Sequence, residues 1–102
     1  MLNQIVLVGR IVKIEERETS TETTLSVVTI SVPRSYKNIN GEYDIDFIEV
    51  TLWNNIAKNT MEYCHKGDLI GIRGRIECNK ELRIVADKIT FLSNKISQED
   101  NN

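Results

Sequence analysis

The sequence has few of the residues that build metal centres or catalytic sites. It contains one histidine, His65, and two cysteines, Cys64 and Cys78, without a C-x-x-C pair or a cluster of histidines. Because zinc-ligand spacings are missing and cytosolic cysteines rarely pair, we expect two reduced structural thiols. His65 follows a predicted helix, where an imidazole meets the negative end of the helix dipole, so we interpret it as a helix-end residue and not as a general base. We expect no metal site and no cofactor.

Long apolar runs are also missing. No stretch approaches the roughly 20 apolar residues that cross a bilayer. The region from Ile5 to Ile14 does not follow the pattern of a signal peptide, because Gly9, Arg10 and Lys13 interrupt it. We therefore expect a cytoplasmic protein without a membrane partner. The 102 residues suffice for one domain with its own core and are too few for two.

The sequence lacks an excess of positive charge. Its formal net charge is −2, whereas nucleic-acid-binding domains are usually basic. Glutamates crowd residues 15–22, and most of the cations lie further along the chain. These later cations are Arg34, Lys37, Lys58, Lys66, Arg73, Arg75, Lys80 and Arg83. Since the local field matters more than the sum, the net charge argues only against binding by bulk attraction.

What the sequence does contain is the periodicity of β-strands. Alternating apolar residues, rich in Ile and Val, predict strands over residues 2–14, 24–32, 46–53, 68–77 and 82–92. Gly9 indicates a bulge or bend in the first strand, and Pro33 should end the second, because proline cannot donate to a ladder. We expect the polar residues 15–23 to form a loop or a frayed hairpin end, and residues 93–102 to form a short disordered tail.

A helix is predicted between the third and fourth strands. Asn54 or Asn55 can cap its start, and Gly67 should supply the left-handed residue that ends it. Its expected buried stripe consists of Ile56, Ala57, Thr60, Met61 and Cys64. Five strands with one helix in this place follow the order of the OB-fold, an all-β, partly open Greek-key barrel that binds oligonucleotides or oligosaccharides. We predict this fold for a domain of residues 1–92.

Aromatic residues on the third strand are the first candidate binding feature. By alternation, Phe47 and Trp53 share one face with Glu49 and Thr51, while Ile48, Val50 and Leu52 share the other. Aromatics spaced in this way form either a base-stacking platform on a solvated sheet or packing beneath a loop. The sequence leaves both interpretations open.

A predicted hairpin is the second candidate. Asn40-Gly41 is a strong signal for a tight turn. The arms of this hairpin carry Arg34, Tyr36, Lys37 and Tyr43. Tyrosines beside cations can grip bases and phosphates, but a solvated loop accounts for them equally well.

Several blocks of the sequence match one family in order and spacing. MLNQIVLVGRI at the start, the stretch from Asp46 to Ile76 with its K-G-D-L-I-G-I-R-G-R end, and the later V-A-D and F-L resemble the bacterial single-stranded DNA-binding protein family. The resemblance implies sequence-independent binding that coats and protects single-stranded DNA in replication, recombination or repair. It also implies a homo-oligomer, with a tetramer favoured over a dimer. Carried over by position, it assigns base stacking to Tyr36, Phe47 and Trp53 and phosphate contacts to Arg10, Arg34, Lys37, Arg73 and Arg75.

The sequence departs from that family in two places. The hairpin before the last strand, usually a long basic and aromatic arm, is cut to Cys78-Asn79-Lys80-Glu81. The last residues lack the glycine-rich linker and the acidic tip ending in Pro-Phe, so we do not expect recruitment of repair enzymes through a tail. A short form of this kind also resembles the primosomal replication protein N group. The alternative function is therefore an OB-fold adaptor that acts mainly through protein contacts in replication restart.

An enzyme is the least favoured interpretation. Glu42, Asp44 and Asp46 alternate, and on one strand face they could bind a divalent metal as nucleases do. The sequence has no histidine near them, no nucleophile–base pair and no phosphate-cradling glycine loop. We therefore do not expect an enzyme.

Overall fold

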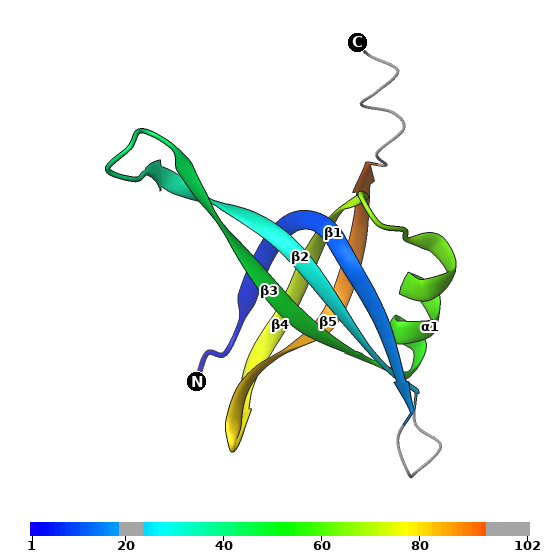
Figure 1. Ribbon diagram of the computed structural model, residues 1–102. Coiled ribbons are helices and arrows are strands. Elements are labelled where there is room, and N and C mark those ends of the chain that lie inside the picture. The colour runs from blue at the N-terminus through cyan, green and yellow to red at the C-terminus, as the bar shows by residue number, and fades with distance from the viewer. Residues whose placement is uncertain (19–23, 94–102) are drawn as a thin grey trace.

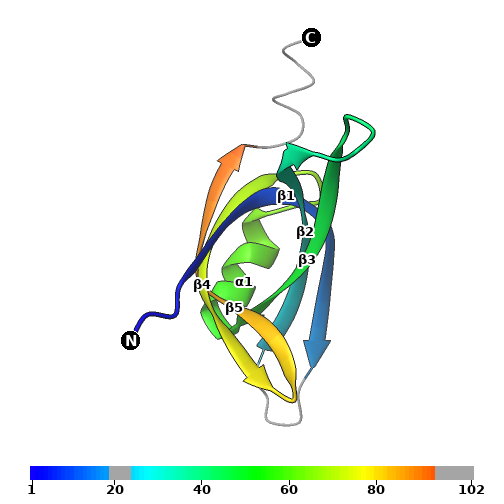
Figure 2. The ribbon, with the colours of Figure 1, turned by 90° about the vertical axis from the view of Figure 1, so that its left-hand side faces the viewer.

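The computed structural model describes residues 1–18 and 24–93, so the expectations for residues 19–23 and 94–102 lie outside the described residues. Its elements are β1 (Ile5–Glu18), β2 (Thr24–Lys37), β3 (Tyr43–Trp53), α1 (Asn54–Tyr63), β4 (Leu69–Asn79) and β5 (Glu81–Ser93). The strands close into a barrel in the order β1-β2-β3-β5-β4 (Figures 1 and 2). Among the strand pairs of the described residues, only β3–β5 is parallel. This is the predicted OB-fold.

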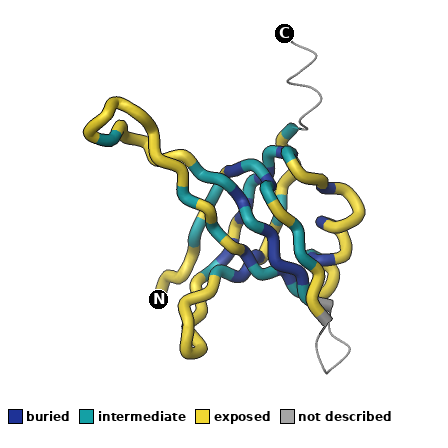
Figure 3. Tube along the Cα trace, in the orientation of Figure 1, coloured by how far each residue is buried: buried dark blue, intermediate teal, exposed yellow. Residues whose placement is uncertain are grey.

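The alternating pattern of the strands fills the barrel. Val50 and Leu52 of β3, Val28 and Ile30 of β2, and Ile72 of β4 are at most 1% exposed and belong to one apolar cluster. Their sequence neighbours face outward, as period-two alternation requires. In Figure 3 the barrel strands are mostly buried or half-buried, while the hairpins that extend from them are exposed.

β1 is shared between two neighbours and bends across the barrel. It pairs with β4 through Arg10 and with β2 from Arg10 onward. A Cβ atom on Gly9 would lie 2.6 Å from the carbonyl oxygen of Ser31, so only glycine lets β1 pass β2 this closely. The irregularity in pairing lies between Ile11 and Lys13, just beyond the predicted position.

Two strands are longer than their composition indicates. Residues 15–18 were expected in a loop or a frayed hairpin end, but they extend β1 as paired strand, because Glu16 and Arg17 pair with Ser26 and Leu25 of β2. The prediction that Pro33 ends β2 is also wrong, since β2 continues to Lys37. β1 pairs with β2 only as far as Ser31, so Pro33 stands where β2 has a single neighbour, an edge position that proline tolerates.

The helix differs from its prediction at both ends. Trp53 is the N-cap, with no side-chain cap hydrogen bond, so neither Asn54 nor Asn55 caps α1, because β3 leads into the helix without a loop. The helix ends at Tyr63, and the C-cap is Cys64, whose N–H donates to the carbonyl oxygen of Thr60 at 2.9 Å. Gly67 has the expected positive φ of 94°, but it belongs to the following turn.

The buried stripe of α1 is narrower than predicted. Ala57, Thr60 and Cys64 are buried, Ile56 is half-buried, and Met61 is 37% exposed. Cys78, the other thiol, is free and exposed on β4. In the part of the chain that the structure describes, no helix has the length and apolar character needed to cross a bilayer.

Candidate nucleic-acid interface

The outer face of β3 carries an exposed apolar strip. Tyr43, Ile45 and Phe47 alternate along the strand and are 54%, 52% and 66% exposed. Phe47 pairs with Ser31 of β2, so no bulky partner covers its ring. The sequence pointed to Tyr43 only as a residue of the hairpin arm and did not point to Ile45, although extending the period-two pattern backward from Phe47 would have placed both on this face.

Trp53 stands at the other end of this face and is half-buried. It pairs with Leu25 and immediately precedes α1. Of the two interpretations drawn from the sequence, a stacking platform suits Phe47, which presents most of its ring to solvent. Trp53 combines an outward position with packing.

The β2–β3 hairpin projects beyond the barrel as an arm (Figure 1). Gly41 has a φ of 78°, and its N–H donates to the carbonyl oxygen of Asn38 at 3.0 Å. The side chain of Asn38 accepts from the N–H groups of Asn40 at 2.9 Å and Glu42 at 3.0 Å. These bonds close the turn at the predicted Asn40-Gly41 position.

The arm distributes its aromatics over two faces. Lys37 pairs with Tyr43, and its Nζ lies 5.9 Å from the centre of the Tyr43 ring, within the range of a cation–π interaction. Tyr36 is 62% exposed and precedes Lys37, so alternation places it on the opposite face from Tyr43 and Phe47. The arm therefore does not unite Tyr36 and Phe47 on one surface, and a strand that contacts both must pass around it.

Arg34 is paired with carboxylates. Its Nε and Nη2 donate to the two carboxylate oxygens of Asp46 at 3.1 and 3.0 Å, and its Nη1 lies 3.8 Å from Asp44. The hydrogen bond from Arg34 lowers the pKa of Asp46, and the same bond raises the pKa of Arg34. Asp44 and Asp46, considered above as metal ligands, thus bind this arginine.

Arg75 on β4 is paired in the same way. Its Nε donates to Glu77 at 2.9 Å, and its Nη1 donates to Asp87 of β5. Asp87 is the residue that the pairing skips, because Arg73 pairs with Lys88 and Gly74 with Ala86. Among the described residues, Arg73 is exposed and has no carboxylate within 4.0 Å.

Arg10 has a role inside the fold. Its Nη1 donates to the carbonyl oxygen of Gly67 at 2.9 Å in a partly buried position. Backbone bonds on either side join Gly67 to Ile11 at 2.7 Å and Ile11 to Asp68 at 2.9 Å. Arg10 thereby ties the turn before β4 to β1, a role that its position in the sequence does not indicate.

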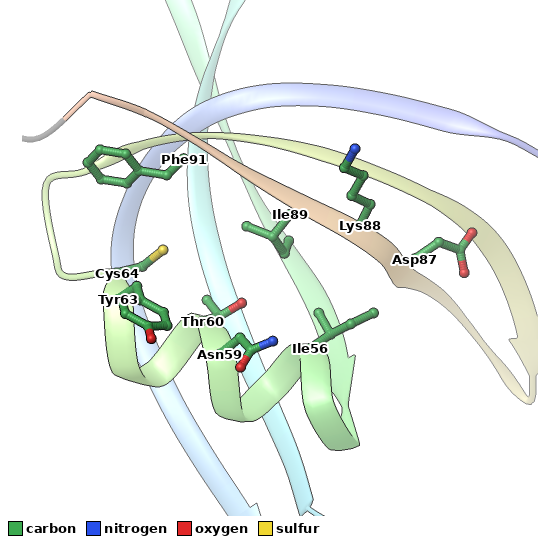
Figure 4. Close-up of a pocket in the computed structure, with 9 residues that line it drawn as sticks. All are labelled: Ile56, Asn59, Thr60, Tyr63, Cys64, Asp87, Lys88, Ile89 and Phe91. Atoms are coloured by element: carbon green, nitrogen blue, oxygen red, sulfur yellow. The ribbon is translucent and has the colours of Figure 1, made fainter.

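Two concave sites of the described residues bear on the candidate interface. A small groove of about 150 Å³ lies where the short β4–β5 hairpin meets the outer face of β1–β3, and Arg17, Val27, Thr51 and Arg83 help to line it. A larger one of about 420 Å³ separates α1 from β5 (Figure 4). Ile56 and Ile89 point into the larger groove, and Tyr63 and Phe91 lie at one end (Figure 4). The small groove adjoins the aromatic face of β3.

Fold and site together define an OB-fold with an exposed aromatic arm and cations beside it, which is the construction of single-strand binders. Residues 2–92 match the single-strand binding protein family, and the chain belongs to that family.

Two relatives show the extent of the similarity. Single-stranded DNA-binding protein B of Bacillus subtilis (strain 168) is 40% identical in an alignment of 106 positions, which covers 93% of this chain and 94% of that protein. The single-stranded DNA-binding protein of Streptococcus mutans is 34% identical over 97% of this chain and 67% of its own length.

Solved structures support the fold. The single-stranded DNA-binding protein from Thermus aquaticus superposes with a TM-score of 0.74 at 20% identity, over 90% of this chain and 50% of that one. The protein priB from Ralstonia solanacearum superposes with a TM-score of 0.72 at 15% identity, over 90% of this chain and 100% of that one. Both have the barrel in common with this chain.

Proposed function

We propose that residues 1–92 bind single-stranded DNA without sequence preference and coat it during replication, recombination or repair. The observation that carries this proposal is the exposed strip of Tyr43, Ile45 and Phe47 on the outer face of a single-strand-binding barrel. Every base has a π face, so stacking on aromatic rings tolerates any sequence. The names of the relatives agree with this activity.

The proposed contacts follow from the geometry. Tyr36, Phe47 and Trp53 stack on bases, with Tyr43 as an addition to the sequence-predicted set. The basic residues assigned to the phosphate backbone are Arg10, Arg34, Lys37, Arg73 and Arg75. Arg73 and Lys37 make these contacts directly, whereas Arg34 and Arg75 first leave their carboxylate partners. Arg10 contributes its charge from the middle of β1 while it keeps its bond to Gly67.

We further propose a cytoplasmic homo-oligomer. Cys64 and Cys78 are free thiols, as in a reducing compartment. Val6 and Val8 of β1 are 69% and 49% exposed and alternate on the outer face of the barrel. A second copy covering this apolar face would account for the exposure of both side chains, since exposed apolar patches mark interaction surfaces.

Replacing Phe47 with alanine tests the proposal. Tyr63 on α1 is the matched control, because it is 67% exposed and Phe47 is 66% exposed, so neither truncation should disturb the core. Loss of one stacked base, worth about 1–3 kcal/mol, should weaken binding of oligo(dT) by roughly 5- to 150-fold in Phe47→Ala and leave Tyr63→Ala unchanged.

The measurement is quenching of Trp53 fluorescence by oligo(dT), with duplex DNA of equal length as the second control. Far less quenching by duplex is expected. Equal affinities of the two alanine variants, or no quenching by oligo(dT) at low salt, would contradict the proposal.

A further inference from the structure

We propose that Asp46 and Asp87 are built-in competitors of the DNA phosphate, because each holds an arginine that the phosphate backbone needs. The inference rests on the proposed function, and it assigns to these carboxylates control over affinity and over its dependence on salt. The sequence pointed to Asp46 only as a possible metal ligand and did not point to Asp87.

The geometry of Arg34 carries the argument. A guanidinium binds a phosphate with the same two-pronged fork that it offers to a carboxylate. In this structure the Nε–Nη2 fork is occupied by Asp46 at 3.1 and 3.0 Å, and Nη1 faces Asp44 at 3.8 Å. All three nitrogens are therefore directed at carboxylates, and the cluster of one cation and two anions has a net charge of −1.

Arg75 repeats the arrangement on another pair of strands. Its Nε is bonded to Glu77 and its Nη1 to Asp87, again one cation against two anions. Asp87 reaches Arg75 because it is the extra residue of β5 at the irregularity beside Gly74. Two independent elements of the barrel thus neutralise a candidate phosphate contact by the same device.

The pairs are exposed enough to exchange partners. The side chains of Arg34 and Asp46 are 42% and 47% exposed, and those of Arg75 and Asp87 are 40% and 44% exposed. Ion pairs this open to water are weak, so a phosphate can displace the carboxylate. An arginine that stays bound to its carboxylate neutralises no phosphate and releases no counterion from the DNA, whereas a free arginine that binds a phosphate does.

The test compares Asp46→Asn with Glu62→Gln. Both changes remove one negative charge from the intact chain, but Glu62 lies on α1 and has no cation within 4.0 Å among residues 1–18 and 24–93. Affinity for oligo(dT) is measured by Trp53 quenching at several salt concentrations. Removing a unit charge about 6 Å from a phosphate in water should tighten binding about threefold, and the slope of log K against log salt should become more negative by about 0.7.

The second step makes Asp46→Asn in an Arg34→Gln background. If Asp46 acts by occupying Arg34, its replacement brings no gain once the arginine is gone. The same design applied to Asp87→Asn and Arg75→Gln tests the second pair.

The outcomes separate the possible failures. Weaker binding by Asp46→Asn would show that Asp46 positions Arg34 for DNA and would overturn the inference. An equal gain in Glu62→Gln, or a gain that persists without Arg34, would also overturn it by assigning the effect to net charge. If the unaltered protein does not bind oligo(dT), the proposed function itself fails.

Discussion

Replacing Gly74 with alanine should force β4 away from β5. A Cβ atom at this position would lie 2.2 Å from the carbonyl oxygen of Val85 and 3.1 Å from the Cα of Ala86. Both are backbone atoms of β5, so no side-chain rotation relieves the contact. The strands must separate by about 1 Å before such a contact becomes ordinary. Val85 and Ala86 are buried, so the displacement reaches the core.

Two opposing effects determine how far Gly74→Ala lowers the free energy of unfolding. Overpacking of a core costs about 1–3 kcal/mol and occasionally more, and a contact with backbone belongs at the upper end of that range. Alanine also restricts the unfolded chain, which returns about 0.4–1 kcal/mol. We therefore expect Gly74→Ala to lower the free energy of unfolding by about 2–3 kcal/mol, which lowers Tm by about 10–20 °C in a domain of this size.

Gly71 supplies the control on the same strand. Its nearest atoms would lie 3.8 Å from an added Cβ, which is ordinary van der Waals contact, and its φ is not positive. Gly71→Ala has the same effect on the unfolded chain, so the difference between the two variants isolates the steric effect. Urea unfolding followed by circular dichroism gives both free energies. Equal stability of the two variants would refute the close approach of β4 and β5 at Gly74.

Three further predictions concern β1 and the thiols. Val8→Glu should reduce the mass of the protein in light scattering, because it places a charge on the proposed oligomer surface. Leu82→Glu, at a side chain 70% exposed on β5, should leave the mass unchanged. An unchanged mass in Val8→Glu would exclude this face of β1 as the oligomer surface. The exposed Cys78 should react rapidly with a thiol reagent at pH 8, and Cys64, 5% exposed, should react only on unfolding. Burial, followed by the nearby Asp68, raises the pKa of the Cys64 thiol. The stability that the neutral thiol contributes is therefore complete below the ordinary pKa of a cysteine and is lost as the pH rises through the raised pKa. The urea midpoint should begin to fall above about pH 9, and a midpoint unchanged to pH 10 would contradict the burial of Cys64.

The fold could be predicted because it depends on local patterns. Alternation identified the interior of β3 at Val50 and Leu52, and Asn40-Gly41 identified the arm. The errors occurred where pairing overrides composition. The polar composition of residues 15–18 is typical of a loop or a frayed hairpin end, yet partners on β2 hold these residues in a strand. Pro33 is tolerated because β1 has already left β2, which is a property of the barrel and not of the residue.

The candidate site was harder to predict, because its charges depend on register. Counting outward from the turn, where Lys37 pairs with Tyr43, places Arg34 directly opposite Asp46. The irregularity between Pro33 and Lys37 shifts the pairing, so that Val32 faces Asp46 and the arginine reaches the carboxylate diagonally. The pairing of Arg75 with Asp87 depends on a second irregularity, and no sequence signal marks it.

Base stacking, and not charge, reconciles a net charge of −2 with the proposed binding to a polyanion. Two of the five candidate phosphate contacts, Arg34 and Arg75, are neutralised by carboxylates, so charge alone supplies little attraction. Stacking does not depend on charge, and three bases on Tyr36, Phe47 and Trp53 would contribute about 3–9 kcal/mol before ordering costs, comparable with the roughly 8 kcal/mol of a micromolar complex. In the proposed complex the aromatics therefore supply most of the affinity, and the paired arginines adjust it and determine how strongly salt alters it. A carboxylate that is replaced by a phosphate also leaves the arginine oriented, so neutralisation in the free protein does not prevent the contact in the complex.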